Sequence, residues 1–137
     1  ISLTGEVTPF WEASLGYTYL DGEITQTTSS AVAGTRLQQL PEHQITAWNR
    51  FNLSDRLGVG AGLIYQGEQF TSFSNNVTLP DYVRVDAALF YTVSDRVSVQ
   101  VNVENLFDEQ YYPSAHGDNN IQPGRPFTAR FGVRLSL

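Results

Sequence analysis

The sequence contains no cysteine and no lysine, and each absence restricts what the protein can do. Without cysteine there can be no disulfide, no thiolate metal site and no cysteine nucleophile. The 8 basic residues are all arginine and stand against 14 acidic residues, which gives a formal net charge of −6 at pH 7. Because this charge balance does not suit nucleic-acid phosphates, we expect no nucleic-acid binding.

Long apolar runs are also missing from the sequence. No stretch approaches the ~20 apolar residues that a membrane-spanning helix requires, and no signal peptide opens the chain. Charged residues make up only 16 % of the 137 residues, whereas a soluble domain has about a quarter. Because Ile1 already lies inside an alternating strand pattern, we expect the chain to be a fragment of a longer protein.

Alternation of apolar and polar residues is present along most of the chain and predicts an all-β protein. It is clearest where Val97, Val99, Val101 and Val103 are separated by polar residues. Most of the predicted strands exceed the usual ~5–6 residues and suit the ~9–11 residues of a tilted membrane strand. We predict seven strands, at residues 1–8, 10–25, 42–53, 56–70, 81–93, 96–107 and 126–137.

The predicted connections alternate between short and long. Tight turns rich in proline, serine and aspartate fall between the first and second, third and fourth, and fifth and sixth strands. Between these hairpins lie long polar segments at 26–41, 71–80 and 108–125. All long loops are therefore expected at one end of the sheet, which is the systematic arrangement of outer-membrane barrels.

The two faces of the predicted strands differ in charge. Every second residue along a strand points to the same face, and we call each such set of residues a phase. One phase is apolar, with Asn49 as its clearly polar exception, and it would face either a soluble core or lipid. The other phase has many glycine, serine and threonine residues, which favours a crowded polar lumen over a water-exposed sheet. A soluble β-sandwich, a lipocalin-like binding module and a small passive membrane pore remain as alternatives. The charged residues of the second phase are Glu12, Arg50, Arg84, Asp86, Glu104, Arg130 and Arg134.

The stretch Asn105-Leu106-Phe107-Asp108, followed by Tyr111-Tyr112, a loop with "PGRP" and an alternating last strand, resembles the C-terminal end of TonB-dependent outer-membrane receptors. The ferric-siderophore branch is the best match, and upstream segments such as "LGVGAGLIYQGEQF" agree with it in order. The resemblance implies an antiparallel up-and-down transmembrane β-barrel, of which this chain would supply about seven strands. It also implies a 22-stranded complete barrel filled by a plug.

The resemblance further implies transport and not enzymatic activity, without a cofactor. Residues 1–137 would be the C-terminal portion of the barrel of an outer-membrane receptor for ferric siderophores in a Gram-negative bacterium. The plug and the TonB box would lie outside this chain, so TonB would bind the missing N-terminal region. The other implied partners are outer-membrane lipid and lipopolysaccharide, and the barrel-assembly machinery through Ala129–Leu137. Leu137 departs from the terminal aromatic residue of the family.

Candidate ligand-binding residues lie in the last long loop. The family collects iron chelates with aromatic and polar loop residues, which indicates Tyr111, Tyr112 and His116, although packing in the aromatic girdle or within the loop is the preferred explanation for them. We predict no metal site, because the loop around His116 offers too few ligands. For His43 a hydrogen bond at the start of a strand is expected.

Catalytic residues are not predicted. The chain lacks a G-x-S-x-G nucleophile elbow. Glu12, Asp86 and Glu104 could pair as glycosidase carboxylates do. The preferred interpretation is a ladder of charges in which these carboxylates offset arginines on neighbouring strands.

Overall fold

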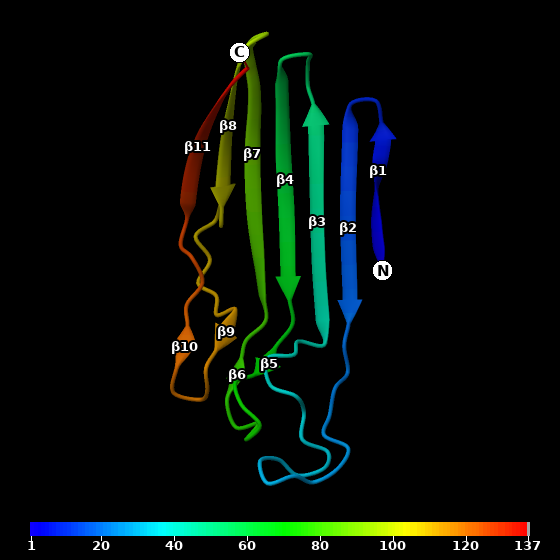
Figure 1. The fold of residues 1–137 in the computed structure, drawn as a ribbon, viewed down its shortest axis with the longest axis vertical. Coiled ribbons are helices and arrows are strands. Elements are labelled where there is room, and N and C mark those ends of the chain that lie inside the picture. The colour runs from blue at the N-terminus through cyan, green and yellow to red at the C-terminus, as the bar shows by residue number, and fades with distance from the viewer. Residues whose placement is uncertain (137) are drawn as a thin grey trace.

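The computed structural model describes residues 1–136, which form a single antiparallel sheet of seven long strands with three connecting loops (Figure 1). The order in the sheet is β1-β2-β3-β4-β7-β8-β11. Two short hairpins, β5–β6 and β9–β10, lie in the loops. No helix long and apolar enough to cross a membrane occurs in the described residues. The long strands are β1 Ser2–Thr8, β2 Trp11–Tyr19, β3 His43–Asn52, β4 Leu57–Gln66, β7 Tyr82–Ser94, β8 Val97–Glu104 and β11 Thr128–Leu135. The short strands are β5 Gln69–Phe70, β6 Thr78–Leu79, β9 Ser114–Ala115 and β10 Ile121–Gln122.

All seven predicted strands are confirmed, but several end earlier than expected. The strand predicted at 10–25 ends at Tyr19, and the remaining residues enter a loop. The strand predicted at 56–70 is interrupted at residues 67–68, although the Gly67 N–H still donates to the His43 carbonyl at 2.8 Å in register with the Gln44–Gln66 pair. The strand predicted at 96–107 ends at Glu104 because Asn105 adopts a left-handed φ of 54°. The predicted end of the last strand at Leu137 lies outside the described residues.

The predicted separation of turns and loops is confirmed. The tight turns β1–β2, β3–β4 and β7–β8 share one end of the sheet, and the three long connections share the other (Figure 1). We refer to these connections as loop A (residues 20–42), loop B (67–81) and loop C (105–127). Each loop joins neighbouring long strands of the sheet, which is the up-and-down topology expected for a barrel wall.

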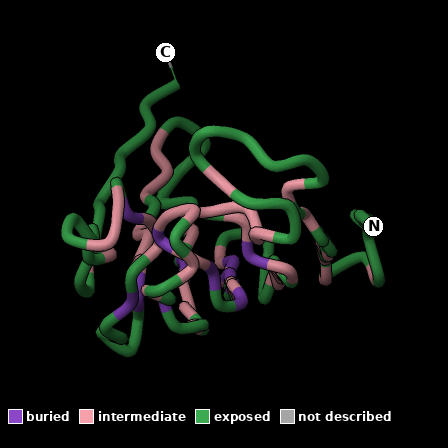
Figure 2. Tube along the Cα trace, turned by 90° about the horizontal axis from the view of Figure 1, so that it is seen from below, coloured by how far each residue is buried: buried purple, intermediate pink, exposed green. Residues whose placement is uncertain are grey.

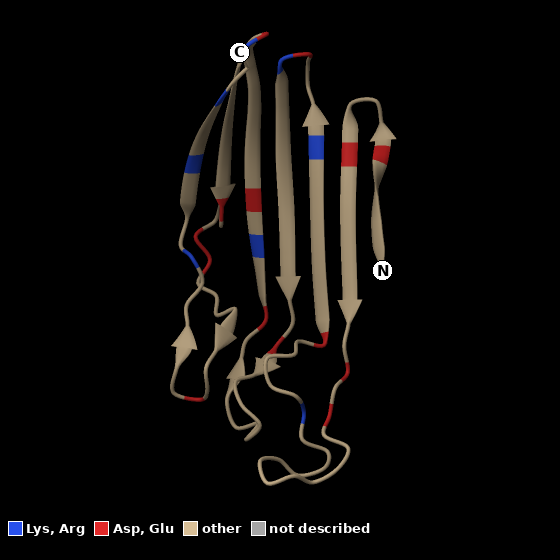
Figure 3. Ribbon diagram, viewed as in Figure 1, with Lys and Arg blue, Asp and Glu red and all other residues tan. Residues whose placement is uncertain are grey.

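The strand register keeps the two phases apart across the whole sheet. One row of neighbouring residues runs from Gly5 to Ala129 and is uncharged, whereas the adjacent row runs from Glu6 to Arg130 and carries charges. Figure 3 shows how few charges interrupt the long strands. The uncharged row is Gly5, Ala13, Asn49, Ala61, Ala87, Val103 and Ala129. The charged row is Glu6, Glu12, Arg50, Gly60, Ala88, Asn102 and Arg130.

The apolar phase is exposed and not packed into a core. Phe131 is 77 % exposed, Val133 68 % and Leu135 68 %, and outward residues of the central strands such as Leu63 and Leu89 are also exposed. The view from the loop end shows that few residues are buried (Figure 2). No second sheet covers this face within residues 1–136. The β-sandwich alternative is therefore not supported, because a sandwich must bury its apolar face against another sheet.

Asn49, the polar exception on the apolar phase, is satisfied by a neighbouring side chain. The indole Nε1 of Trp11 donates a hydrogen bond to Asn49 Oδ1 at 3.0 Å. The Trp11 ring also stacks on Phe51 with centroids 5.7 Å apart. The amide therefore contributes a hydrogen-bond acceptor to an aromatic cluster on the apolar face.

On the opposite, charged phase, Trp48 lies flat over glycines of β4. A Cβ atom placed at Gly62 would lie 2.5 Å from Trp48 Cε3, and one at Gly60 would lie 2.6 Å from Trp48 Cζ2. These glycines therefore make room for the indole, which covers backbone that lacks side chains of its own. With Arg50 and Phe90, Trp48 lines a cleft of about 450 Å³ on this face.

We predict that Gly62→Ala destabilises the protein by about 1–3 kcal/mol, because the new methyl group would force the indole of Trp48 out of its position. The matched control is Gly5→Ala, since nothing lies within 4 Å of a Cβ there. Urea denaturation of the folded protein in detergent would measure both variants. Adding Trp48→Ala should remove most of the penalty at Gly62. Equal stability of the two glycine variants would contradict the close contact.

Candidate functional site in the long loops

Loops B and C contain the most deeply buried side chains of the described structure. The largest fully buried side chains are Leu79, Asn105 and Thr71, and all three lie in or beside the loops and not in the middle of the sheet. Ala115 of the β9–β10 hairpin is also only 1 % exposed. Loops B and C therefore pack against each other at one end of the sheet.

Asn105 holds together the two ends of loop C. Its side-chain Nδ2 donates to the carbonyls of Glu109 at 3.0 Å and Arg125 at 2.9 Å, and its Oδ1 accepts from the Glu109 N–H at 2.9 Å. Asparagine tolerates the left-handed backbone found here better than most residues. Asp108 adds a second connection, because its Oδ1 accepts from the Phe127 N–H at 2.7 Å. The Asn-Leu-Phe-Asp sequence is thus a turn that closes the base of loop C.

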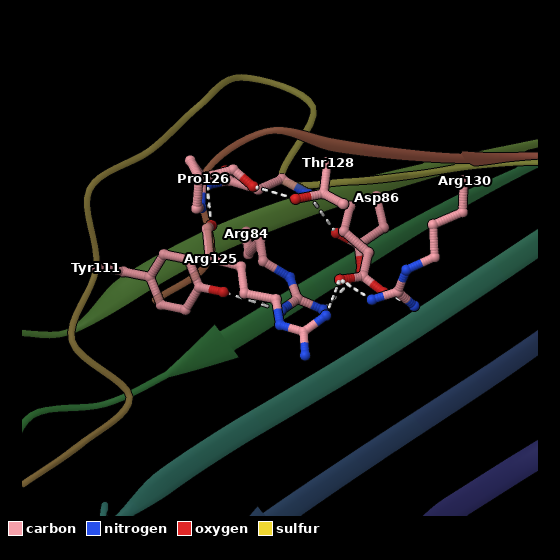
Figure 4. A network of polar contacts seen from close by, with 9 residues as sticks. Arg84, Asp86, Tyr111, Arg125, Pro126, Thr128 and Arg130 are labelled. Atoms are coloured by element: carbon pink, nitrogen blue, oxygen red, sulfur yellow. Dashed lines mark hydrogen bonds and ion pairs between the residues drawn. The ribbon is translucent and has the colours of Figure 1, made fainter. Parts of the chain in front are cut away.

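A polar network joins this turn to the wall of the sheet (Figure 4). Asp86 on β7 accepts from the Asn105 N–H at 2.9 Å and forms an ion pair of 2.8 Å with Arg84. Arg84 in turn donates to the hydroxyl of Tyr111 at 3.1 Å. Tyr111 is 5 % exposed, and its ring lies 4.6 Å from that of Tyr82. Tyr111 therefore fixes loop C against β7.

Tyr111 and Tyr112 also border a cleft of about 430 Å³ between the two ends of loop C. Tyr112 is 37 % exposed and remains accessible from outside. Gly124 forms the opposite wall, and a Cβ atom there would lie 2.2 Å from the Tyr111 ring. The remaining lining residues are Asp108, Glu109, Gln110, Pro123 and Pro126.

His116 lies apart from this cleft, in the exposed turn between β9 and β10. The backbone N–H of His116 donates to the Asn120 carbonyl at 2.8 Å. Gly117 has a left-handed φ of 143° that the turn requires. The structure thus brings Tyr111 and Tyr112 together and places His116 at the tip of the same loop. Within residues 1–136 no group of three or more metal-binding side chains converges.

The predicted charge ladder is present in part. Arg130 of β11 pairs with Glu104 of the neighbouring strand β8 at 2.8 Å, whereas Asp86 pairs with Arg84 on its own strand β7 and not with an arginine on a neighbouring strand. Glu12 lies beside Arg50 in the register, but among the described residues no ion pair includes Glu12. The Arg50 guanidinium lies instead over the Phe90 ring, 4.6 Å from its centroid.

His43 makes the hydrogen bond that was expected at the start of its strand. Its Nδ1 lies 3.0 Å from the hydroxyl of Tyr17, and the two rings stack with centroids 6.1 Å apart. Tyr19 adds a second aromatic contact, with its ring centroid 5.2 Å from that of His43. His43 therefore belongs to an aromatic cluster at the loop end of β2 and β3.

Sequence reasoning did not single out Asp118, which lies two residues after His116. Its carboxylate accepts hydrogen bonds from the hydroxyls of Thr71 at 2.5 Å, Ser72 at 2.7 Å and Ser74 at 2.9 Å. These donors lower the pKa of Asp118, so the carboxylate stays ionised at neutral pH. No local pattern near Asp118 points to the Thr-Ser-Phe-Ser segment, which lies more than 40 residues away in the sequence.

Comparison with known proteins identifies the class of protein to which the seven-stranded sheet and its loops belong. Residues 1–106 match the family model described as TonB dependent receptor-like, beta-barrel. The chain belongs to this family of TonB-dependent receptor β-barrels. Members of the family are outer-membrane transport receptors and not enzymes.

Two relatives are siderophore receptors by name. The chain is 33 % identical over 129 residues to the probable TonB-dependent siderophore receptor PiuA of Acinetobacter baumannii, covering 87 % of this chain. It is 34 % identical over 134 residues to the catecholate siderophore receptor Fiu of Escherichia coli K12, covering 93 % of this chain. The chain spans only 17 % of the length of PiuA and 18 % of that of Fiu.

Solved structures of the same relatives share the fold. The structure of PiuA superposes with a TM-score of 0.87 at 31 % identity and covers 98 % of this chain and 20 % of PiuA. The closed form of Fiu gives the same TM-score, identity and coverage. A ferripyoverdine receptor of Pseudomonas aeruginosa, 24 % identical, matches in fold with a TM-score of 0.79 over 98 % of this chain and 18 % of that receptor. The seven-stranded sheet is therefore a segment of a receptor β-barrel.

Proposed function

We propose that this chain is the C-terminal portion of the barrel of an outer-membrane receptor that takes up ferric siderophores with energy supplied through TonB. The observation that carries the proposal is the identity of 33 % and 34 % to two siderophore receptors along nearly the whole chain. The plug domain and the TonB box lie outside residues 1–137 in this proposal. TonB accordingly contacts a region of the protein that this chain does not contain.

The outward phase supports a location in the bacterial outer membrane. Its exposed apolar residues would contact lipid tails, while lipopolysaccharide would surround the loop end. The remaining strands of a 22-stranded barrel would pair with the free edges of β1 and β11. The alternating residues of Ala129–Leu137, with Phe131 and Val133 outward, form the segment that we assign to recognition by the barrel-assembly machinery.

Loop C supplies the ligand-binding residues in this proposal. Tyr112 lies accessible at the cleft and His116 at the exposed tip, so both are placed to touch an arriving ferric chelate. Tyr111 contributes by holding the loop on Arg84, since its own ring is buried. Aromatic side chains suit this role because they offer a large contact area at a low entropy cost.

Uptake of ⁵⁵Fe bound to catecholate or hydroxamate chelators tests the proposal in cells that produce the full-length receptor. We expect uptake of at least one chelate, complete loss of that uptake when TonB is inactivated, and a roughly fivefold weaker apparent affinity for Tyr112→Ala. Asn119→Ala is the control, because Asn119 is exposed and outside the cleft. Uptake that continues without TonB would instead identify a passive pore.

A further inference from the structure

Loops B and C are joined by side chains that lie far apart in the sequence. The carboxylate of Asp118 in loop C accepts from three hydroxyls of loop B, and one of the donors, Thr71, is only 1 % exposed. A second contact lies nearby, where Gln69 Nε2 donates to the Pro113 carbonyl at 2.9 Å. Hydrogen bonds to an ionised carboxylate are roughly twice as strong as neutral ones, so this connection is strong for a pair of loops.

Loops A and B are joined by a separate set of contacts. Asn75 of loop B bonds the backbone of Arg36 in both directions: its Oδ1 accepts from the Arg36 N–H at 2.9 Å, and its Nδ2 donates to the Arg36 carbonyl at 3.1 Å. The Gln39 N–H donates to the Phe70 carbonyl at 2.8 Å. The Arg36 guanidinium lies 5.7 Å from the centroid of the Phe70 ring.

Loop B is therefore the middle member of the three. Among the hydrogen bonds of residues 1–136, none joins loop A directly to loop C. Any influence of one outer loop on the other through these bonds must pass through loop B, along the segment from Gln69 to Asn75. That segment is fixed at Thr71 by Asp118 and at Asn75 by the backbone of loop A.

We propose that Asp118 and Asn75 are positioning residues that join loops A, B and C into one rigid cap, so that a ligand contact on loop C changes the order of loop A. His116 lies two residues before Asp118 in the sequence, so the cap also fixes the turn that carries His116. The cap keeps the β9–β10 hairpin against loop B. This inference rests on the proposed uptake function for its biological purpose, but the mechanical coupling exists without a ligand. Energetic coupling between sites is reciprocal, so releasing Asn75 must loosen loop C as releasing Asp118 loosens loop A.

Hydrogen–deuterium exchange on the full-length receptor in lipid nanodiscs, without ligand, tests the coupling directly. In Asp118→Ala we expect amides of loop A, including those of Arg36 and Gln39, to exchange roughly tenfold faster than in the unaltered protein. In Asn75→Ala the same increase is expected in the β9–β10 hairpin of loop C. Asp118→Glu keeps the carboxylate and should restore part of the protection, which a loss of folding would not do.

The control is Asn119→Ala, which alters the same turn but no bond of the cap, and it should leave exchange in loop A unchanged. Faster exchange confined to loop B in Asp118→Ala would overturn the proposal, because it would mean that the loops loosen separately. An effect of Asn119→Ala equal to that of Asp118→Ala would overturn it as well.

A second measurement separates this inference from the proposed function. Apparent affinity and maximal rate of ⁵⁵Fe uptake are compared for Asp118→Ala and the unaltered receptor, with the chelate that the unaltered receptor transports. We expect roughly tenfold weaker affinity with a nearly unchanged maximal rate, because the cap positions the ligand-binding residues. Coupled exchange without uptake of any chelate would support the cap and refute the uptake function, whereas uptake without coupled exchange would refute the cap alone.

Discussion

Replacing Asn105 with alanine is expected to cost about 4 kcal/mol of folding free energy and to open the base of loop C. Three side-chain hydrogen bonds would be lost, at about 1 kcal/mol each, and the partners left behind would be partly buried. Alanine would also have to adopt the left-handed φ of 54°, which costs about 1–2 kcal/mol for a residue with a Cβ atom. Urea denaturation and protease cleavage within loop C would measure the effect.

A glycine at the same position separates the two causes. Asn105→Gly removes the hydrogen bonds but accepts the left-handed backbone, so we expect a cost of about 3 kcal/mol. The matched control is Asn76→Ala, since Asn76 is an exposed asparagine of loop B and should change stability by less than about 0.5 kcal/mol. If Asn105→Ala is no worse than Asn76→Ala, the side chain of Asn105 does not close loop C.

The second large effect concerns the apolar face of the sheet, which we propose meets lipid. Val101 lies on the apolar phase in the middle of β8, between Leu89 and Phe131. An arginine there is expected to cost about 2–4 kcal/mol, because a charged group would face the hydrocarbon core of the bilayer. We expect Val101→Arg to reduce the amount of folded, heat-modifiable receptor in the outer membrane and to lower its stability in lipid vesicles.

The neighbouring position provides the matched control for this substitution. Gln100 precedes Val101 on the same strand, but it belongs to the opposite phase and lines a polar cleft with Arg134. Gln100→Arg should therefore assemble normally and change stability by less than about 1 kcal/mol. Equal damage from both substitutions would contradict the assignment of the two faces.

The sequence predicted the strands of the barrel segment well because one physical period, the alternation of apolar and polar residues, determines them. Alternation assigns each strand residue to a face, and one register slip would move a charge such as Arg50 into lipid. The strand pairing therefore follows from the pattern alone. Strand ends were less predictable: at 20–25 the alternation continues into loop A, although the backbone there pairs within the loop through the Glu23–Arg36 bridge.

The loops were predictable in position but not in structure. Asn105 belongs to the stretch that resembles TonB-dependent receptors, but the resemblance does not reveal its role. That role depends on the carbonyls of Glu109 and Arg125, which only folding brings close to the Asn105 side chain. The contacts of Asp118 join residues more than 40 positions apart and follow no periodic pattern. Such bonds depend on the three-dimensional arrangement of the loops, so a single sequence carries no local signal for them.

The free edges of the sheet have a consequence for how such a wall enters a membrane. β1 and β11 each pair with one neighbour only, so the outer N–H and C=O groups of both strands lack partners in the sheet. Every unpaired group in hydrocarbon costs several kcal/mol, and an open sheet carries two such rows at once. Insertion of this segment is therefore thermodynamically inseparable from closure: the two seams must be joined to other strands before, or while, the wall leaves water.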